Sequence, residues 1–372
     1  MKRLVLCCDG TWNSPVRESV SNVEKIARAV DTGVMPDGVE QVVFTVGGVG
    51  AGGYTVDRLL GGAFGYGLTQ HVVDGYRVLA LNYEPGDEVY VFGFSRGAYT
   101  ARSIVGMTAA VGLLRPGAVL QNRLRDAERL YRARSDANAA ERQAFRDEFA
   151  YRTLPVAMLG VFDTVGELGV PGVTSRRSRF HDVRLSDDVR CARQALSIDD
   201  RRLKFAPCLW EVPDGAAPGR VKQVWFPGAH SDVGGGTQHQ ALSDVTLRWM
   251  LEEARALGLV VDPERLDAQL DDEPLFQLRC APGPLYAAIN LWRRLRRHPG
   301  FRGDRRVLEP TSPGDGVRIS STAVRLSGPG AGDYGAFARN IGWWRERAGE
   351  DFGGAVEPIA FAEHDERRLV VL

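Results

Sequence analysis

The stretch EVYVFGFSRGAYTARSIVG, residues 88–106, decides the fold. Its first half, EVYVFGF, is rich in β-branched and aromatic residues and is typical of a buried strand. Its second half places apolar residues at helical spacing. Between the halves lies the G-x-S-x-G pentapeptide Gly93 to Gly97, so Ser95 is expected on the sharp bend of a nucleophile elbow.

The flanking glycines fit this interpretation. Gly93 and Gly97 leave room for a strained backbone and for close packing of helix on strand, and the N–H groups that open the helix favour negative charge beside the Ser95 hydroxyl. The motif in this context predicts a catalytic Ser95. A glycine-hinged turn with no catalytic role is the alternative.

The pattern around the elbow predicts an α/β fold. Strands and helices alternate along the chain, which favours an α/β-hydrolase-like, doubly wound and mostly parallel sheet with helices on both faces, helical insertions and a less regular C-terminal region. The expected strands are 3–8, 41–46, 88–94, 155–162 and 221–226, and the expected helices are 23–30, 66–83, 96–108, 187–198 and 241–257.

We predict two regions along the chain. Residues 1–262 form the catalytic core, and residues 263–372 form a C-terminal extension packed on it. Within the core, 118–152 is helical and dense in charge, which is typical of a solvated helix pair; placed just after the nucleophile helix, it is also a candidate lid. Within the extension, 285–298 is a basic amphipathic stretch, either a surface helix or a peripheral membrane contact.

Bulk composition excludes several classes of protein. With 47 basic and 47 acidic residues there is no net field to recruit nucleic acid. The five cysteines indicate small core residues rather than a disulfide framework. The N-terminal apolar run is too short for a signal peptide, and no run is long enough to span a membrane. We therefore expect a cytoplasmic protein, with signal-independent secretion as the only route out.

A serine nucleophile needs a base and an acid that orients it. Of six histidines, His230 follows a predicted strand in the order Ser, acid, His of α/β-hydrolases, and His239 is the competitor. Asp163 follows the predicted strand 155–162, which lies between Ser95 and His230 in the chain, and is the predicted acid, because ligand sites lie at the carboxyl ends of parallel strands. Asp232 is the alternative acid, and Asp9 is an outsider.

Oxyanion donors are expected from the backbone. One is the N–H of Arg96, which follows the nucleophile, and the other is the N–H of Gly10 or Thr11 in the loop after the first strand. An Asp-Gly turn capped by Asp9 explains Gly10 and Thr11 equally well.

Two signals suggest other chemistry. Gly48, Gly50 and Gly53 satisfy G-x-G-x-x-G after a strand, which is typical of dinucleotide binding, but the residues that follow are broken by glycines. The oxygen-rich set of Asp9, Asp163, Asp232 and His230 is compatible with a divalent metal, although the spacing is loose. We predict neither a cofactor nor a metal.

Six ordered blocks carry a family resemblance: LVLCCDGTWN, GGVGAGG, GFSRGAYTAR, GVFDTVG, ALSIDDRRLKFAP and WFPGAHSDVGGG. Over roughly residues 3–257 the chain resembles the uncharacterised α/β-hydrolase domain family that includes the family-1 phospholipase effectors of type VI secretion. The resemblance implies a serine acyl hydrolase with its triad on Ser95, Asp163 and His230. The block around Leu196 to Asp200 belongs to the resemblance without a known chemical role.

The expected function is therefore hydrolysis of a carboxylic ester by a Ser-His-Asp triad through an acyl-enzyme, with a phospholipid or other acyl ester as substrate. A soluble small-ester esterase and a non-catalytic scaffold that binds lipid or protein are the alternatives. An immunity or secretion partner is compatible with the resemblance but leaves no signal in the sequence.

Overall fold

The computed structural model describes residues 1–10, 19–47, 64–133, 136–152, 154–165, 184–273, 275–278, 301–303, 305–310, 314–328, 334–360, 365 and 367–371. Within them, a nine-stranded sheet runs through the molecule in the order β12-β11-β7-β6-β5-β4-β1-β3-β2. All its pairs are parallel except β2 with β3. Its strands are β1 (Lys2–Cys8), β2 (Gly33–Val34), β3 (Glu40–Val46), β4 (Glu88–Phe94), β5 (Val156–Phe162), β6 (Val189–Ser197), β7 (Val221–Phe226), β11 (Val317–Ser320) and β12 (Val356–Glu357).

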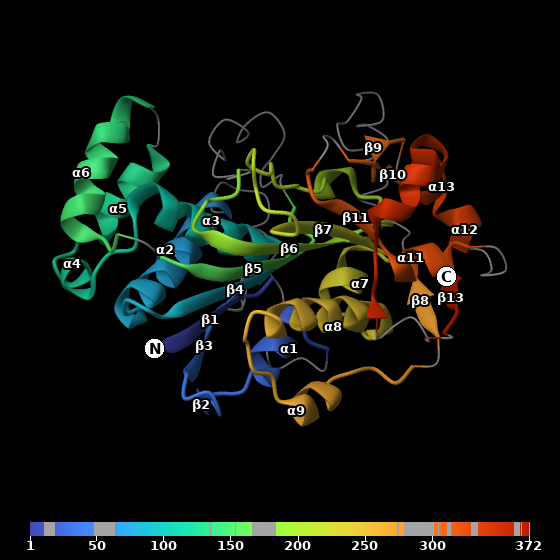
Figure 1. Cartoon of the computed structure of the whole chain (residues 1–372), viewed down its shortest axis with the longest axis horizontal. Coiled ribbons are helices and arrows are strands. Elements are labelled where there is room, and N and C mark those ends of the chain that lie inside the picture. The colour runs from blue at the N-terminus through green and yellow to red at the C-terminus, as the bar shows by residue number, and fades with distance from the viewer. Residues whose placement is uncertain are drawn as a thin grey trace.

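Helices cover both faces of this sheet, as Figure 1 shows. Alternate side chains of β4 point into two separate cores: Tyr90 and Phe92 join the one beneath α1 and α8, and Val89 and Val91 join the one beneath α2 and α3. The predicted doubly wound α/β fold is confirmed. The helices named here are α1 (Asn22–Ala29), α2 (Phe64–Asn82), α3 (Arg96–Val111) and α8 (Ala241–Arg255).

One predicted element is wrong. Residues 187–198 were expected to be helical, but 189–197 form strand β6 between β5 and β7. The segment VRCARQALS contains alanine, arginine and glutamine, which favour helices, yet pairing on both sides outweighs this local preference. The charge of Arg193 is accommodated by Glu253 of α8, at 2.5 Å between Nε and Oε2.

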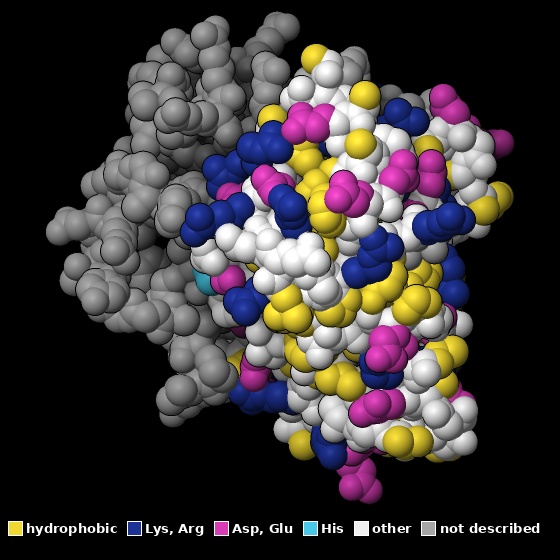
Figure 2. All heavy atoms as spheres, turned by 90° about the vertical axis from the view of Figure 1, so that its left-hand side faces the viewer, with side chains coloured by type: hydrophobic (Ala, Val, Ile, Leu, Met, Phe, Trp, Pro, Cys, Tyr) yellow, Lys and Arg dark blue, Asp and Glu magenta, His cyan; other side chains and the backbone are white. Residues whose placement is uncertain are grey.

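The insertion after α3 is helical as expected. It comprises α4 (Pro116–Leu120), α5 (Leu124–Arg132) and α6 (Ala139–Phe149), and Arg146 donates to the carbonyl of Ala109 near the C-terminal end of α3. Ser95 lies at the other end of that helix, whose 16 residues span roughly 24 Å. Charges of both signs intermingle on this face in Figure 2. A role as lid stays a prediction.

The C-terminal region contributes to the main sheet. Strand β11 pairs with β7, and β12 pairs with β11, so the region extends the sheet beyond residue 262. The boundary at 262 stays a prediction, and 285–298 lies outside the described residues. The other elements are α9 (Pro263–Asp267), β8 (Phe276–Leu278), β9 (Phe301–Arg302), β10 (Arg305–Arg306), α11 (Ser321–Leu326), α12 (Tyr334–Phe337), α13 (Arg339–Ala348) and β13 (Leu369–Val371).

Across the described part of the chain, no helix combines the length and the apolar character that crossing a bilayer requires.

Candidate active site

Ser95 lies on a strained bend between β4 and α3. Its backbone has φ 58° and ψ −117°, a region that residues other than glycine rarely adopt. Its N–H donates to the carbonyl of Phe162 at 3.1 Å, which ties the bend to the end of β5. The side chain makes no capping hydrogen bond to α3. This backbone strain at a single serine is typical of a functional position.

The two glycines of the motif are required by contact, not only by conformation. A Cβ on Gly93 would lie 2.6 Å from the carbonyl oxygen of Gly97. A Cβ on Gly97 would lie 2.0 Å from the carbonyl oxygen of Cys8, at the end of β1. The elbow can therefore form only with glycine at both positions, which brings α3 against the first strand.

Asp163 follows β5 at the same edge of the sheet and is fully buried, with 0% of its surface exposed. Its φ is also positive, at 38°. Oδ2 accepts a hydrogen bond from Nδ1 of His230 at 2.7 Å, and Oδ1 accepts one from the backbone N–H of Ser197 at 3.1 Å. A carboxylate on Nδ1 leaves Nε2 of the ring to accept a proton.

His230 opens the short helix α7 (His230–Gly234), which follows β7. Its ring contacts two aromatic side chains, with centroid distances of 4.7 Å to Phe94 and 5.0 Å to Phe205. Because Phe94 immediately precedes Ser95, the imidazole lies beside the elbow. The structure thus brings the predicted base and the predicted acid together next to the predicted nucleophile.

The alternative residues have other contacts. Asp232 accepts from the backbone N–H of Ala229 at 2.8 Å, whereas Nδ1 of His230 contacts Asp163. His239 lies beyond α7, with Nδ1 3.7 Å from Oε1 of Glu273.

The loop that leads to His230 is held by three aspartates, of which sequence analysis left Asp199 and Asp200 without a role. Three consecutive backbone N–H groups each donate to a different carboxylate. These pairs are Gly228 to Asp199 at 2.8 Å, Ala229 to Asp232 at 2.8 Å and His230 to Asp200 at 3.3 Å. Asp199 and Asp200 belong to the block after β6, and recognising that segment as a strand would have placed them at the same edge as Asp163.

These carboxylates differ in pKa. Burial raises the pKa of Asp232 to about 7, with Asp199 and Asp200 adding to the rise and the Ala229 N–H opposing it. Burial likewise raises the pKa of Asp199 to about 6, against the hydrogen bonds from Gly228 and Tyr334. Burial also acts on Asp200, but the pKa of that group is lowered overall because Arg202 binds it.

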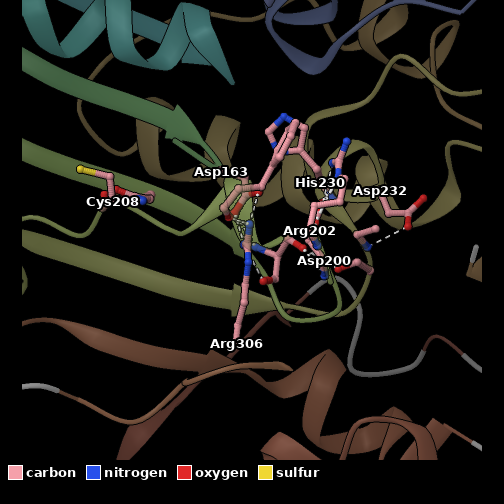
Figure 3. A network of polar contacts seen from close by, with 12 residues as sticks. Asp163, Asp200, Arg202, Cys208, His230, Asp232 and Arg306 are labelled. Atoms are coloured by element: carbon pink, nitrogen blue, oxygen red, sulfur yellow. Dashed lines mark hydrogen bonds and ion pairs between the residues drawn. The ribbon is translucent and has the colours of Figure 1, made fainter. Parts of the chain in front are cut away.

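A third group on Asp163 was missed by sequence analysis. Arg306 of β10 is fully buried, and its guanidinium contacts both carboxylate oxygens, Nη1 to Oδ1 at 2.6 Å and Nη2 to Oδ2 at 3.1 Å. Figure 3 shows Asp163 between His230 and Arg306. Burial raises the pKa of Asp163, but Arg306 and His230 outweigh it and hold that pKa well below its usual range. No local motif around residues 305 and 306 signals this contact.

The predicted oxyanion donors stay predictions. Arg96 is the first residue of α3, where a backbone N–H has no acceptor within its own helix. The N–H of Gly10 donates to Oδ1 of Asp9 at 2.6 Å, and that oxygen also accepts from the Ser21 hydroxyl at 2.6 Å. Thr11 lies outside the described residues.

The metal alternative finds no site among the residues that the structure describes. These residues hold no group of three His, Cys, Asp or Glu side chains that could bind a metal ion. The glycine-rich loop with Gly48, Gly50 and Gly53 lies outside them.

Comparison with known proteins yields a family match and a curated relative. The model of the family described as "T6SS, Phospholipase effector Tle1-like, catalytic domain" matches residues 2–253. The uncharacterized protein YEL023C of Saccharomyces cerevisiae is 30% identical over 235 residues, which cover 57% of this chain and 33% of the yeast protein. The chain thus spans about a third of that relative's length.

Two solved structures also resemble the chain. A crystal structure of an uncharacterized protein from Pseudomonas aeruginosa superposes with a TM-score of 0.44 at 20% identity, covering 79% of this chain and 51% of that one. The Tle1 effector bound to the VgrG spike of the type VI secretion system superposes with a TM-score of 0.44 at 15% identity, covering 73% and 76% of the two chains.

Proposed function

The chain belongs to the family of Tle1-like phospholipase effectors of the type VI secretion system, and we propose that it hydrolyses a carboxylic ester bond of a phospholipid with Ser95, His230 and Asp163. The family match supports lipase activity in general. The observation that carries the residue assignment is the 2.7 Å hydrogen bond between His230 and Asp163 beside the strained elbow serine.

In the proposed reaction, Nε2 of His230 takes the proton of the Ser95 hydroxyl while Oγ attacks the ester carbonyl. Asp163 fixes the tautomer of the ring and stabilises the imidazolium. The backbone N–H of Arg96, with Gly10 or Thr11 as second donor, stabilises the oxyanion, and one such donor is worth about 3–4 kcal/mol of transition-state free energy. For Gly10 this requires that its N–H leave the Asp9 carboxylate. His230 then protonates the leaving alcohol, and water hydrolyses the acyl-enzyme.

The site allows a clear test of the nucleophile. A fluorophosphonate probe should label Ser95, and Ser95→Ala should abolish both labelling and ester hydrolysis while the fold is kept. Ser103→Ala is the matched control, because Ser103 is on the same helix and its buried hydroxyl has no hydrogen-bond partner. A folded wild-type protein that is neither labelled nor active on any ester would support the non-catalytic scaffold instead.

The substrate class needs its own test. Hydrolysis of a short p-nitrophenyl ester in free solution is compared with hydrolysis of phospholipids below and above the concentration at which they form vesicles. A sharp rise of the rate on vesicles supports the phospholipase. Equal or better activity on the soluble ester, with no rise on vesicles, would identify a small-ester esterase. Export through a type VI apparatus and an immunity partner are part of the proposal through family membership alone.

A further inference from the structure

The buried guanidinium of Arg306 is placed to act on the proposed triad from outside the segment that the family model matches. That model ends at residue 253, whereas Arg306 comes from β10 in the C-terminal region. Four hydrogen bonds use its Nη atoms: two to Asp163, one to the carbonyl of Ser197 at 2.8 Å and one to the carbonyl of Phe205 at 2.5 Å. Its Nε is buried with no partner.

We propose that Arg306 is a positioning residue, which aligns the Asp163 carboxylate with His230 and sets the pH below which the pair takes up a proton. This inference rests on the proposed function, because it assigns a role toward the same triad.

The geometric argument starts from the shared oxygen. Oδ2 of Asp163 accepts from Nδ1 of His230 and from Nη2 of Arg306, so the fork of the guanidinium fixes the plane in which the carboxylate meets the imidazole. Asp163 has a strained backbone, with φ 38°, and its Oδ1 also accepts a hydrogen bond from the N–H of Ser197. A side chain on a strained backbone keeps its orientation only when its surroundings fix it.

The backbone of Arg306 is itself fixed from the C-terminal region. Asn340 of α13 donates to the carbonyl of Arg306 at 3.3 Å and to the carbonyl of Ile198 at 3.2 Å. One buried hydrogen-bond network therefore joins the end of β6 to β10 and α13 of the C-terminal region.

The electrostatic argument concerns the net charge of the pair. With Arg306 in place, the positive guanidinium balances the negative charge of the buried Asp163 carboxylate. The carboxylate then stabilises a second cation, the protonated His230 ring, less strongly. Without Arg306 a buried carboxylate would face His230 alone. Its proton affinity then rises through desolvation, or it stabilises the imidazolium more strongly, and in both cases the coupled pair takes up a proton at higher pH. The base would be lost to protonation earlier as pH falls.

Other charged groups face this pair and stay in place in the test. Asp200 and Asp199 act on Arg306 from the segment after β6, and Arg202 neutralises Asp200. Asp199 also interacts electrostatically with Arg201 and Arg305, and it accepts a hydrogen bond from the hydroxyl of Tyr334 of α12. Asp199 and Asp232, whose pKa values are raised, titrate alike in the wild type and in the Arg306 variants, so they form a common background.

The experiment measures kcat/KM against pH on a soluble short ester for the wild type, Arg306→Met, Arg306→Gln and Arg306→Lys. Loss of the charge in the Met and Gln variants should move the midpoint of the acidic limb up by about 1 pH unit. The Lys variant keeps the charge but not the fork, so its midpoint should stay while kcat falls on the order of 10-fold with KM unchanged.

Arg193→Met is the matched control, since Arg193 is also a buried arginine in an ion pair, with Glu253, and does not contact the site. It should lower stability without moving the acidic limb. The proposal would be overturned by any of three results. The midpoint of the acidic limb stays at the wild-type pH in the Met or Gln variant, kcat of the Lys variant equals that of the wild type, or Arg193→Met shifts the midpoint as much as Arg306→Met does. Failure of all three Arg306 variants to fold while Arg193→Met folds would also overturn it, because Arg306 would then serve folding alone.

The two proposals fail in distinguishable ways. A wild-type protein without labelling or hydrolysis at Ser95 removes the proposed function. An active wild type whose activity is lost in Ser95→Ala, together with unshifted Arg306 variants, removes only the role of Arg306.

Discussion

A Cβ on Gly97 would lie 2.0 Å from the carbonyl oxygen of Cys8, so helix α3 rests directly on the end of β1. Two consequences of this contact meet at Ser95. The close approach holds the helix start beneath the serine, and it places that helix start against Asp9, which directly follows β1. The contact between Gly97 and Cys8 therefore does two things: it packs α3 against the sheet, and it shapes the proposed catalytic turn.

Gly97→Ala should be strongly destabilising. The new methyl group meets backbone atoms of Cys8 and Asp9, which cannot move aside as a side chain would. We expect a loss of about 2–4 kcal/mol in the free energy of unfolding, measured by urea denaturation. Fluorophosphonate labelling of Ser95 should fall with it. Gly342→Ala is the control, because nothing lies within 4 Å of its Cβ position in α13, and there alanine should be neutral or stabilising by up to about 1 kcal/mol. Equal stability of the two variants would contradict this account of the elbow.

Asp163→Asn should remove activity and stability together. The amide cannot support the imidazolium and favours the wrong tautomer of His230, so kcat should fall on the order of 10⁴-fold. It also leaves the buried Arg306 without its carboxylate, which costs about 3–5 kcal/mol. Kinetics corrected for the fraction of folded protein separate the two effects. Glu253→Gln, which breaks the pair with Arg193 away from the site, should lower stability but keep kcat per folded molecule. Substantial activity in folded Asp163→Asn would assign the acid role elsewhere, with Asp232 as the next candidate.

The sequence was sufficient for the elbow and for the positions of β1, β3, β4, β5 and β7 along the chain, because motif and periodicity are local signals there. The expectation failed at 189–197, where pairing on both sides forms β6 from residues that favour helices. That error hid the role of Asp199 and Asp200, since only a strand end brings them to the loop of His230. The contact of Arg306 with Asp163 could not be predicted from a local pattern, because the two residues are 143 positions apart in the sequence.

Asp232 should make the protein less stable as pH rises. Its pKa is raised to about 7 in the fold, mainly by burial, whereas an aspartate in an unfolded chain has a pKa of about 3.9. Between these values the folded chain keeps a proton that the unfolded chain has released, so the free energy of unfolding falls from about pH 4 to about pH 7. Asp232→Asn keeps an acceptor for Ala229 but cannot ionise. Its stability relative to wild type should grow by roughly 2–4 kcal/mol between about pH 4 and about pH 8, measured by urea denaturation. A constant difference between the two proteins across that range would show that Asp232 ionises normally in the fold.

Removing residues 263–372 should destroy the site even though the family match ends before them. Two losses act together. Strand β11 leaves the edge of β7, which exposes the buried Val224 and Trp225 to water, and Arg306 leaves the carboxylate of Asp163 buried without its cation. Each buried large apolar side chain that becomes exposed costs about 1.5–3 kcal/mol, a large fraction of the net stability of a typical domain. We expect a chain of residues 1–262 to lack a cooperative thermal transition by circular dichroism and to resist fluorophosphonate labelling at Ser95. Adding residues 263–372 as a separate chain should restore labelling only if the two pieces reassemble. A cooperatively folded and fully active 1–262 fragment would instead make the C-terminal region a dispensable extension, and would contradict the contribution of β11 and Arg306 to the core.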